Sequence, residues 1–152
     1  MKKLILFITL FCSFICASMA QNALNNKAEN IIGTYSAKQG DDSFKAKIFQ
    51  QKDGTFTGQI IWLEKDCDAN GNKLLDEKNP DKSLRNTPCD QIVLFSGLKY
   101  NAKDKCWDGT KIYDPQRGIK AKPQAEFTKD GQLQIRGSIL GIGENAYWKK
   151  IK

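Results

Sequence analysis

Histidine is absent from all 152 residues of the chain. Without an imidazole, the chain cannot form Ser-His-Asp or Cys-His catalytic groups, which use histidine as the general base. Histidine ligation of a metal is excluded for the same reason. The acidic residues lie mostly in turn sequences and form no recognisable acid and base pair. The chain is therefore expected not to be an enzyme.

Long apolar runs are also lacking, apart from LILFITLFCSFI at residues 4–15. Lys2 and Lys3 precede this run, and small residues that include Ser18 and Ala20 follow it. The run is shorter than the roughly 20 apolar residues of a membrane-spanning helix, and its flanks are typical of a secretory leader. Residues 1–20 are therefore predicted to be a signal peptide cleaved near Ala20, with no membrane span afterwards.

Cysteine is scarce after this leader, where only Cys67, Cys89 and Cys106 occur. In an oxidising compartment, three cysteines allow one disulfide and one free thiol. Cys67 and Cys89 lie at the two ends of a long polar segment, and a bond between them would close a loop of about 20 residues. Such a bond would stabilise the fold by ~3 kcal/mol. We predict this disulfide, with Cys106 left free beside Trp107.

Positive charge is in excess, with 24 Lys and Arg against 17 Asp and Glu. The leader holds two basic residues and no acidic one, so 22 basic and 17 acidic residues, a net charge of +5, follow it. This balance keeps a small protein soluble and attracts anionic surfaces. No nucleic-acid recognition motif occurs, so no nucleic-acid partner is expected.

Apolar and polar residues alternate in short segments joined by turn sequences such as KDG and DPQRG, and no helical period occurs. Eight strands are predicted, at residues 31–37, 43–51, 55–64, 90–100, 105–113, 119–127, 132–140 and 145–151. Consecutive hairpins form a meander, which avoids open edges by closing into a barrel. The predicted fold is all-β: an eight-stranded antiparallel up-and-down barrel over residues 31–152, preceded by a flexible segment at 21–30. An open β-sandwich is the alternative.

The polar segment 65–88 is the one long loop of this barrel. Asn79 followed by Pro80 predicts a short helical turn within it. A connection of more than ~20 residues is often functional. The loop could therefore bind a protein partner.

The start of this loop, DCDANGNKLLDE at residues 66–77, matches the calcium-loop pattern. The pattern would take its ligands from Asp66, Asp68, Asn70 and Glu77. A strand and a proline flank it, however, where calcium loops have helices. Asn70-Gly71 also favours a plain type I′ hairpin turn. Calcium is the one cofactor that the sequence suggests, and the turn is the alternative.

An eight-stranded barrel is either filled by side chains or holds one small ligand. Trp62, Trp107 and Trp148 are predicted to form apolar walls of a ligand site. Lys111 and Tyr113 share the strand face of Trp107, so the lysine would meet an acidic head group. The alternative is a bulge that turns Ile112 inward and Lys111 outward. The candidate ligand-binding residues are Trp62, Trp107, Lys111, Tyr113 and Trp148.

Four stretches in order, NPDKSLRNTPC, KCWDGTKIYDPQRG, QLQIRGSILG and YWKK, resemble a family of exported bacterial proteins called domain of unknown function 2147. GTY at residues 33–35 is similar to the G-x-W of lipocalin-like barrels. The resemblance implies a small lipocalin-like barrel, without an established activity. Ala121 departs from the family, since a Tyr usually follows the YDP turn.

These observations together predict a periplasmic or secreted protein of the bacterial cell envelope that binds a small apolar or amphipathic ligand. The alternative is a structural or protein-interaction module that works through the 65–88 loop.

Overall fold

The chain folds into antiparallel strands in a computed structural model, which describes residues 22–139 and 141–152. The predicted leader, residues 1–20, lies outside the described residues. Among the described residues, no helix has the length and apolar character needed to cross a membrane. The strands are β1 (Gly33–Gln39), β2 (Asp42–Gln50), β3 (Phe56–Leu63), β4 (Val93–Asn101), β5 (Cys106–Asp108), β6 (Ile112–Asp114), β7 (Ile119–Phe127), β8 (Leu133–Ile139) and β9 (Ile142–Lys150).

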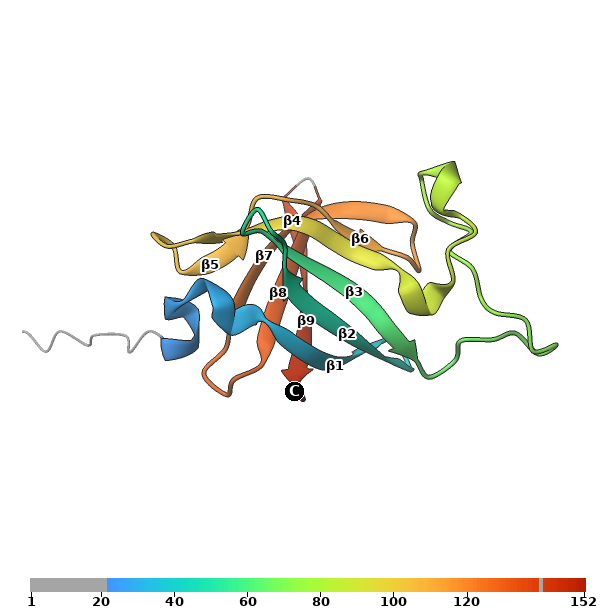
Figure 1. The fold of residues 1–152 in the computed structure, drawn as a ribbon, viewed down its shortest axis with the longest axis horizontal. Helices are drawn as coiled ribbons and strands as arrows, with labels where there is room; N and C mark the ends of the chain where they lie inside the picture. Colours follow the sequence, from blue (N-terminus) through green and yellow to red (C-terminus); the bar gives the residue numbers. More distant parts are fainter. Residues whose placement is uncertain (1–21, 140) are drawn as a thin grey trace, which may run out of the picture.

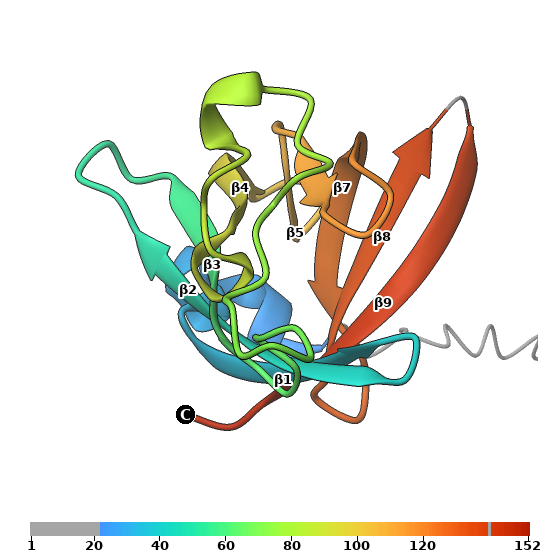
Figure 2. The same ribbon diagram turned by 90° about the vertical axis from the view of Figure 1, so that its right-hand side faces the viewer.

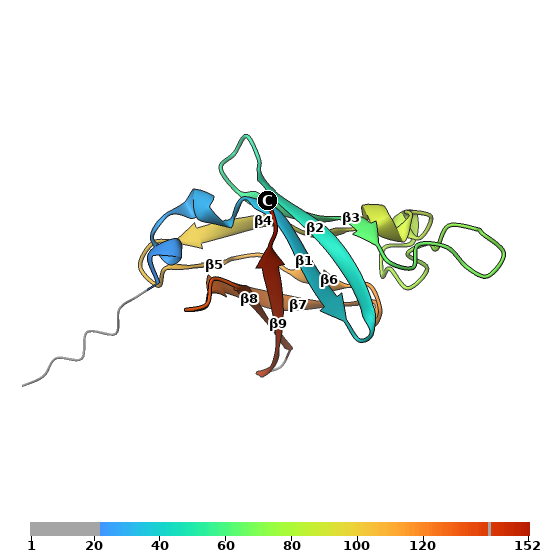
Figure 3. The same cartoon turned by 90° about the horizontal axis from the view of Figure 1, so that it is seen from below.

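The sheet closes on itself because β5 pairs with β4 on one side and with β7 on the other. The remaining neighbours follow the order β4-β3-β2-β1-β9-β8-β7 around the barrel (Figures 1 and 3). β5 and β6 are two pieces of one predicted strand, separated at Gly109, which has a φ of 83°. The predicted eight-stranded antiparallel barrel is therefore confirmed, with its fifth strand broken in two.

Pro123 lies opposite this break, and its position follows from its missing N–H. On one side it pairs with Gly137 of β8. On its other side, Ala121 pairs with β6 and Ala125 pairs with β5, so that Pro123 faces the gap between the two pieces. The loss of pairing that the proline causes is thus confined to one side of one residue.

A bulge in β3 changes the direction of the side chains beyond it. Ala46 of β2 pairs with Ile60, whereas the preceding Lys45 pairs with Trp62, so Ile61 is an extra residue. Trp62 consequently faces outward with 42% of its surface exposed. The ammonium of Lys45 lies 4.8 Å from the centre of the Trp62 ring. The prediction that Trp62 lines the interior is therefore wrong, because strict alternation fails at the bulge.

One end of the barrel is covered by two short 3-10 turns, η1 (Ala23–Asn26) and η2 (Ala28–Ile31) (Figure 1). The indole N–H of Trp107 donates to the carbonyl of Ala28 at 3.1 Å. The Tyr100 hydroxyl donates to the carbonyl of Asn25 at 2.7 Å, and the buried Asn25 amide exchanges hydrogen bonds with the Phe127 backbone. The expectation of a flexible segment at 21–30 is corrected, since residues 22–30 are ordered by these contacts.

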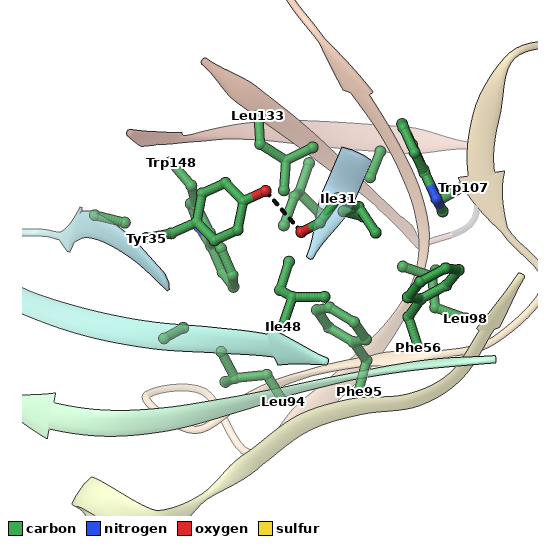
Figure 4. Packing of buried hydrophobic residues seen from close by; sticks show 14 of the residues in the cluster. Ile31, Tyr35, Ile48, Phe56, Leu94, Phe95, Leu98, Trp107, Leu133 and Trp148 are labelled. Atoms are coloured by element: carbon green, nitrogen blue, oxygen red, sulfur yellow. Dashed lines mark hydrogen bonds between the residues drawn. The ribbon is translucent and has the colours of Figure 1, made fainter. Parts of the chain in front are cut away.

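The core fills the half of the barrel beneath these turns (Figure 4). Trp107 is fully buried and meets Phe127 edge-on, with ring centres 5.8 Å apart. The side chains packed with them include Ile31, Phe56, Leu98 and Leu133, all almost fully buried. Tyr35 is also fully buried, and its hydroxyl donates to the Ile31 carbonyl at 2.7 Å. Large side chains thus close this end of the interior.

The long loop leaves from the opposite end (Figures 1 and 3). It contains η3 (Lys82–Leu84), and η4 (Cys89–Gln91) follows just before β4. The predicted helical turn is confirmed, but its cap is Asp81, whose carboxylate accepts from the Ser83 N–H at 2.9 Å, and not Asn79. The β1–β2, β6–β7 and β8–β9 turns lie at this same end, because successive antiparallel connections alternate between ends.

Replacing Tyr35 by Phe should lower the free energy of unfolding by about 1–3 kcal/mol, because it leaves the buried Ile31 carbonyl without its donor. Urea unfolding followed by tryptophan fluorescence measures the change. Tyr147→Phe is the matched control, since Tyr147 is half exposed and should change stability by less than about 0.5 kcal/mol. Equal effects of the two substitutions would contradict the assignment.

Candidate ligand-binding site

A cavity of about 1020 Å³ opens at the end of the barrel opposite to η1 and η2. Its walls come from β1, β2, β4, β6, β7, β8 and β9, together with the β1–β2 and β6–β7 turns. Figure 2 looks toward this end, with the long loop in front and the β8–β9 turn at the upper right. The interior is therefore filled in one half and open in the other.

Trp148 forms the base of this cavity, where the filled half begins. It is 3% exposed, and its ring meets Phe44 edge-on with centres 5.6 Å apart. The centres of the Trp148 and Tyr35 rings are 6.1 Å apart. Trp148 lines the cavity as the sequence predicts, and it presents an apolar surface to anything bound there.

Small residues on the inner faces leave the space above Trp148 empty. The pairings Ile135 with Ala146 and Gly137 with Glu144 put these four residues on one face of the β8–β9 hairpin. Ala37 of β1 and Ala121 of β7 line the same space. A methyl group added at Gly137 would lie 3.3 Å from the Ala121 Cβ, so this side of the cavity is already narrow.

Charged and amide groups lie at the rim. The guanidinium of Arg117, in the β6–β7 turn, contacts Asp114 at 2.8 Å and also pairs with Glu144 of β9. The Gln39 amide of β1 donates to Asp114 at 2.9 Å. Hydrogen bonding from Arg117 lowers the pKa of Glu144, so both partners are charged at neutral pH. The rim therefore combines polar groups above an apolar interior.

Tyr113 connects the cavity wall to the long loop. It is 4% exposed, lines the cavity, and donates through its hydroxyl to the carboxylate of Asp76 at 2.6 Å. The other oxygen of Asp76 accepts from the Asn79 amide at 2.7 Å, and Arg85 donates to the Asn79 carbonyl. Burial, and then the hydrogen bond to Asp76, raises the pKa of Tyr113. Tyr113 is thus a structural anchor of the loop as well as a wall residue.

A second cavity of about 240 Å³ lies between the barrel and the base of the loop. Leu74 and Cys89 of the loop region line its outer side. Five residues line both cavities: Gln39, Ser43, Phe44, Pro115 and Gln116. Phe44 therefore stands between the two spaces. The base of the loop forms part of the wall at the open end.

The other two predicted ligand residues lie elsewhere. Trp107 occupies the filled end and does not line the open cavity. Lys111 falls in the break between β5 and β6 and is exposed, while Ile112 lines the cavity. The alternative orientation, with Ile112 inward and Lys111 outward, is the one that the structure adopts.

The predicted calcium ligands are not brought together. The Asp66 carboxylate pairs with Lys73 at 2.5 Å, and the Asp68 carboxylate accepts from the backbone N–H groups of Asn70 and Asn72. Glu77 joins no group of three acidic or cysteine side chains suited to a metal within the described residues. A hairpin turn explains the 66–77 pattern, and the geometry does not fit calcium. The turn is not of the expected type I′, which needs a positive φ at both central residues, because Gly71 has a φ of 82° but Asn70 has no positive φ.

The predicted disulfide is also absent from the described chain, where Cys67 and Cys89 are separate thiols. The backbone of Cys67 forms an isolated antiparallel β-bridge with Lys73, and the Cys89 N–H donates to the Leu74 carbonyl at 2.8 Å. Each cysteine therefore pairs through its backbone with the chain that lies between them. The Lys73 ammonium contacts both Asp66 and Asp90, at 2.5 and 2.7 Å. This ionic contact joins the two ends of the loop where a covalent bond was expected.

Several wall and rim residues were not predicted from the sequence, among them Phe44, Arg117, Ile139, Ile142, Glu144 and Ala146. A signal for the cavity does exist, because small residues occur at inner positions near the same end of several strands. It can be read only once the strands are placed side by side.

The fold and the open cavity together define a lipocalin-like barrel. Residues 33–150 match the family described as "Uncharacterized protein conserved in bacteria (DUF2147)", and the chain belongs to this family. This confirms the resemblance seen in the sequence.

Among solved structures, the chain is similar to a protein titled "Protein HP1028 from the human pathogen Helicobacter pylori belongs to the lipocalin family". The identity is 25% and the TM-score 0.62, over 80% of this chain and 82% of that one. No curated protein matches.

Tyr113→Phe should loosen the long loop, because it removes a buried hydrogen bond to a carboxylate. We expect a loss of about 1.5–3 kcal/mol in local stability. Amide hydrogen exchange at Asp76 and Asn79, whose N–H groups bond within the loop, should become faster. The amides of β8 serve as the internal control and should be unchanged. Uniform acceleration across the barrel would contradict a local anchoring role.

Thiol titration tests the corrected pairing of the cysteines. The processed protein, denatured without reductant, should contain three reactive thiols, because Cys67, Cys89 and Cys106 are all free in the structure. In the native state Cys67 should react with a maleimide first, since it is exposed, and Cys106 last, since it is buried. A single thiol after denaturation, with a disulfide-linked Cys67–Cys89 peptide found by mass spectrometry, would contradict this result and support the disulfide predicted from the sequence.

Proposed function

We propose that this protein binds a small, partly apolar ligand in the bacterial cell envelope. The observation that supports this most is the open cavity of about 1020 Å³ above Trp148, whose walls carry alkyl and aromatic side chains. Sites for small molecules are typically concave, mainly apolar and provided with a few polar groups that orient the ligand. The similarity to a protein of the lipocalin family agrees with this proposal.

The distribution of polar groups indicates an amphipathic ligand. The apolar part would lie against Phe44, Ile135 and Trp148. A polar head would remain at the rim, within reach of Arg117 and Gln39, where contact with water costs no buried charge. The proposed activity is binding without a chemical step.

The long loop provides a second candidate function, binding of a protein partner. Leu74, Leu75 and Leu84 are each more than one third exposed on it. The Tyr113–Asp76 anchor holds these leucines in a defined position relative to the barrel. Ligand binding remains the primary proposal, because the barrel cavity of about 1020 Å³ is much larger than the one of about 240 Å³ that Leu74 lines.

Organic extraction of the purified protein, followed by mass spectrometry, should recover an amphipathic compound. A fluorescent fatty acid should bind the extracted protein. Ala146→Phe should weaken this binding at least tenfold, because the added ring fills the space opposite Ile135. Gln134→Phe is the matched control: it adds the same ring on the outer face of the same hairpin, beside Tyr147, and should bind as the unaltered protein does.

An empty extract combined with no probe binding would refute the proposal. Equal weakening by both variants would refute the assignment to this cavity. Circular dichroism and urea unfolding show that each variant is folded before the comparison is made.

A further inference from the structure

The β8–β9 hairpin exposes isoleucine side chains at its end. Ile139 and Ile142 pair across the two strands next to the turn and are 40% and 78% exposed. Ile142 is the most exposed large apolar side chain among the described residues. Leaving an isoleucine in water forfeits much of the ~1.5–3 kcal/mol that its burial provides, so exposed apolar groups of this kind commonly mark a binding surface.

Basic side chains surround this apolar end. Lys122 of β7 and Arg136 of β8 are exposed on the outer face of the barrel, and Lys120 lies two residues from Lys122 on the same face. None of the three forms a salt bridge with an acidic residue in the described part of the chain. The Arg136 side chain lies over Gly143, where an added Cβ would meet its Nε at 2.5 Å, so its charge is directed toward the turn.

Acidic groups offset only part of this charge. Asp81 of the long loop lies near enough to Lys120 for the charge of the lysine to help lower the pKa of Asp81, after the hydrogen bonds from Ser83. Glu144 faces inward across the hairpin from Gly137 and is paired with Arg117. Glu126, on the outer face of β7, lies opposite Gln134 and thus nearer the far end of the hairpin. The tip of the hairpin consequently combines an apolar edge with three unpaired positive charges. This combination is complementary to an anionic lipid bilayer, which offers hydrocarbon beneath negatively charged head groups.

From this arrangement we infer that the end of the β8–β9 hairpin docks on an anionic membrane surface, with Ile139 and Ile142 entering the head-group region and Lys120, Lys122 and Arg136 contacting lipid phosphates. Ile139 and Ile142 also line the rim of the cavity, so docking puts its opening against the lipid. An apolar molecule would then pass between bilayer and cavity without crossing bulk water. The inference goes beyond the proposed function and does not require it.

Vesicle co-sedimentation tests the inference, using the processed protein with its N-terminus verified by mass spectrometry. Binding is expected to vesicles of equal parts phosphatidylcholine and phosphatidylglycerol, to weaken as salt is added, and to be much weaker with phosphatidylcholine alone. Ile142→Ser should lower the partition coefficient roughly tenfold, by the apolar surface it removes. Arg136→Gln should lower it about fivefold, as expected for one charge near the surface.

Ile61→Ser is the matched control, because Ile61 is also an exposed isoleucine but lies on β3, which is adjacent to neither β8 nor β9. It should partition as the unaltered protein does. Absence of binding to the anionic vesicles, or equal losses with Ile61→Ser and Ile142→Ser, would overturn the inference. So would a lipid-free dimer that Ile142→Ser dissociates, since the tip would then be an interface between copies.

The fluorescent fatty acid assay, run without vesicles, separates this result from the proposed function. Arg136→Gln with impaired vesicle binding and normal probe binding supports membrane docking, because Arg136 lies on the outer face of the barrel and does not line the cavity. If the unaltered protein binds vesicles but not the probe, membrane docking is supported and the proposed ligand binding is refuted. If it binds the probe but not vesicles, ligand binding is supported and membrane docking is refuted.

Discussion

Closure of the sheet at β5 is the constraint on which the other features depend. Three residues of β5 pair with β4, and Trp107 among them also pairs with Ala125 of β7. Closure leaves no open edge in this part of the sheet and brings the inner faces of distant strands around one space. Trp107 is at once the residue that joins the two sides and the largest side chain of the filled end. Pairing and packing therefore support each other at the same position.

An asymmetry along the barrel axis follows from this arrangement. Trp107, Phe127 and Tyr35 fill the end covered by η1 and η2, and the indole of Trp107 is held by the Ala28 carbonyl. At the other end, small residues such as Gly137 and Ala146 leave the interior open. Large buried side chains thus fill one end of the interior, whereas the other end keeps a cavity.

Contacts at the open end are predominantly polar and close to solvent. Arg117, Asp114 and Glu144 link two turns across the rim, while Lys73 links the ends of the long loop through Asp66 and Asp90. Exposed ion pairs contribute little to overall stability but define local geometry. The buried contact between Tyr113 and Asp76 is the exception, and it ties the loop to the wall. The loop base is consequently part of the site, whereas the hairpin end with Ile142 extends beyond it.

The sequence by itself determined the all-β class, the strand positions, the family and the turn at 82–84, because alternation, turn residues and caps are local properties. It also identified Trp148 as a wall of the interior, which the structure bears out. Only the tertiary structure decided the sides of Trp62 and Lys111, because a bulge at Ile61 and a break at Gly109 each depend on how a neighbouring strand pairs. It also decided that Cys67 and Cys89 remain separate thiols, whose backbones pair with the neighbouring residues Lys73 and Leu74, and that small residues from separate strands meet around one cavity. These outcomes depend on packing between segments far apart in the chain, which no local pattern contains.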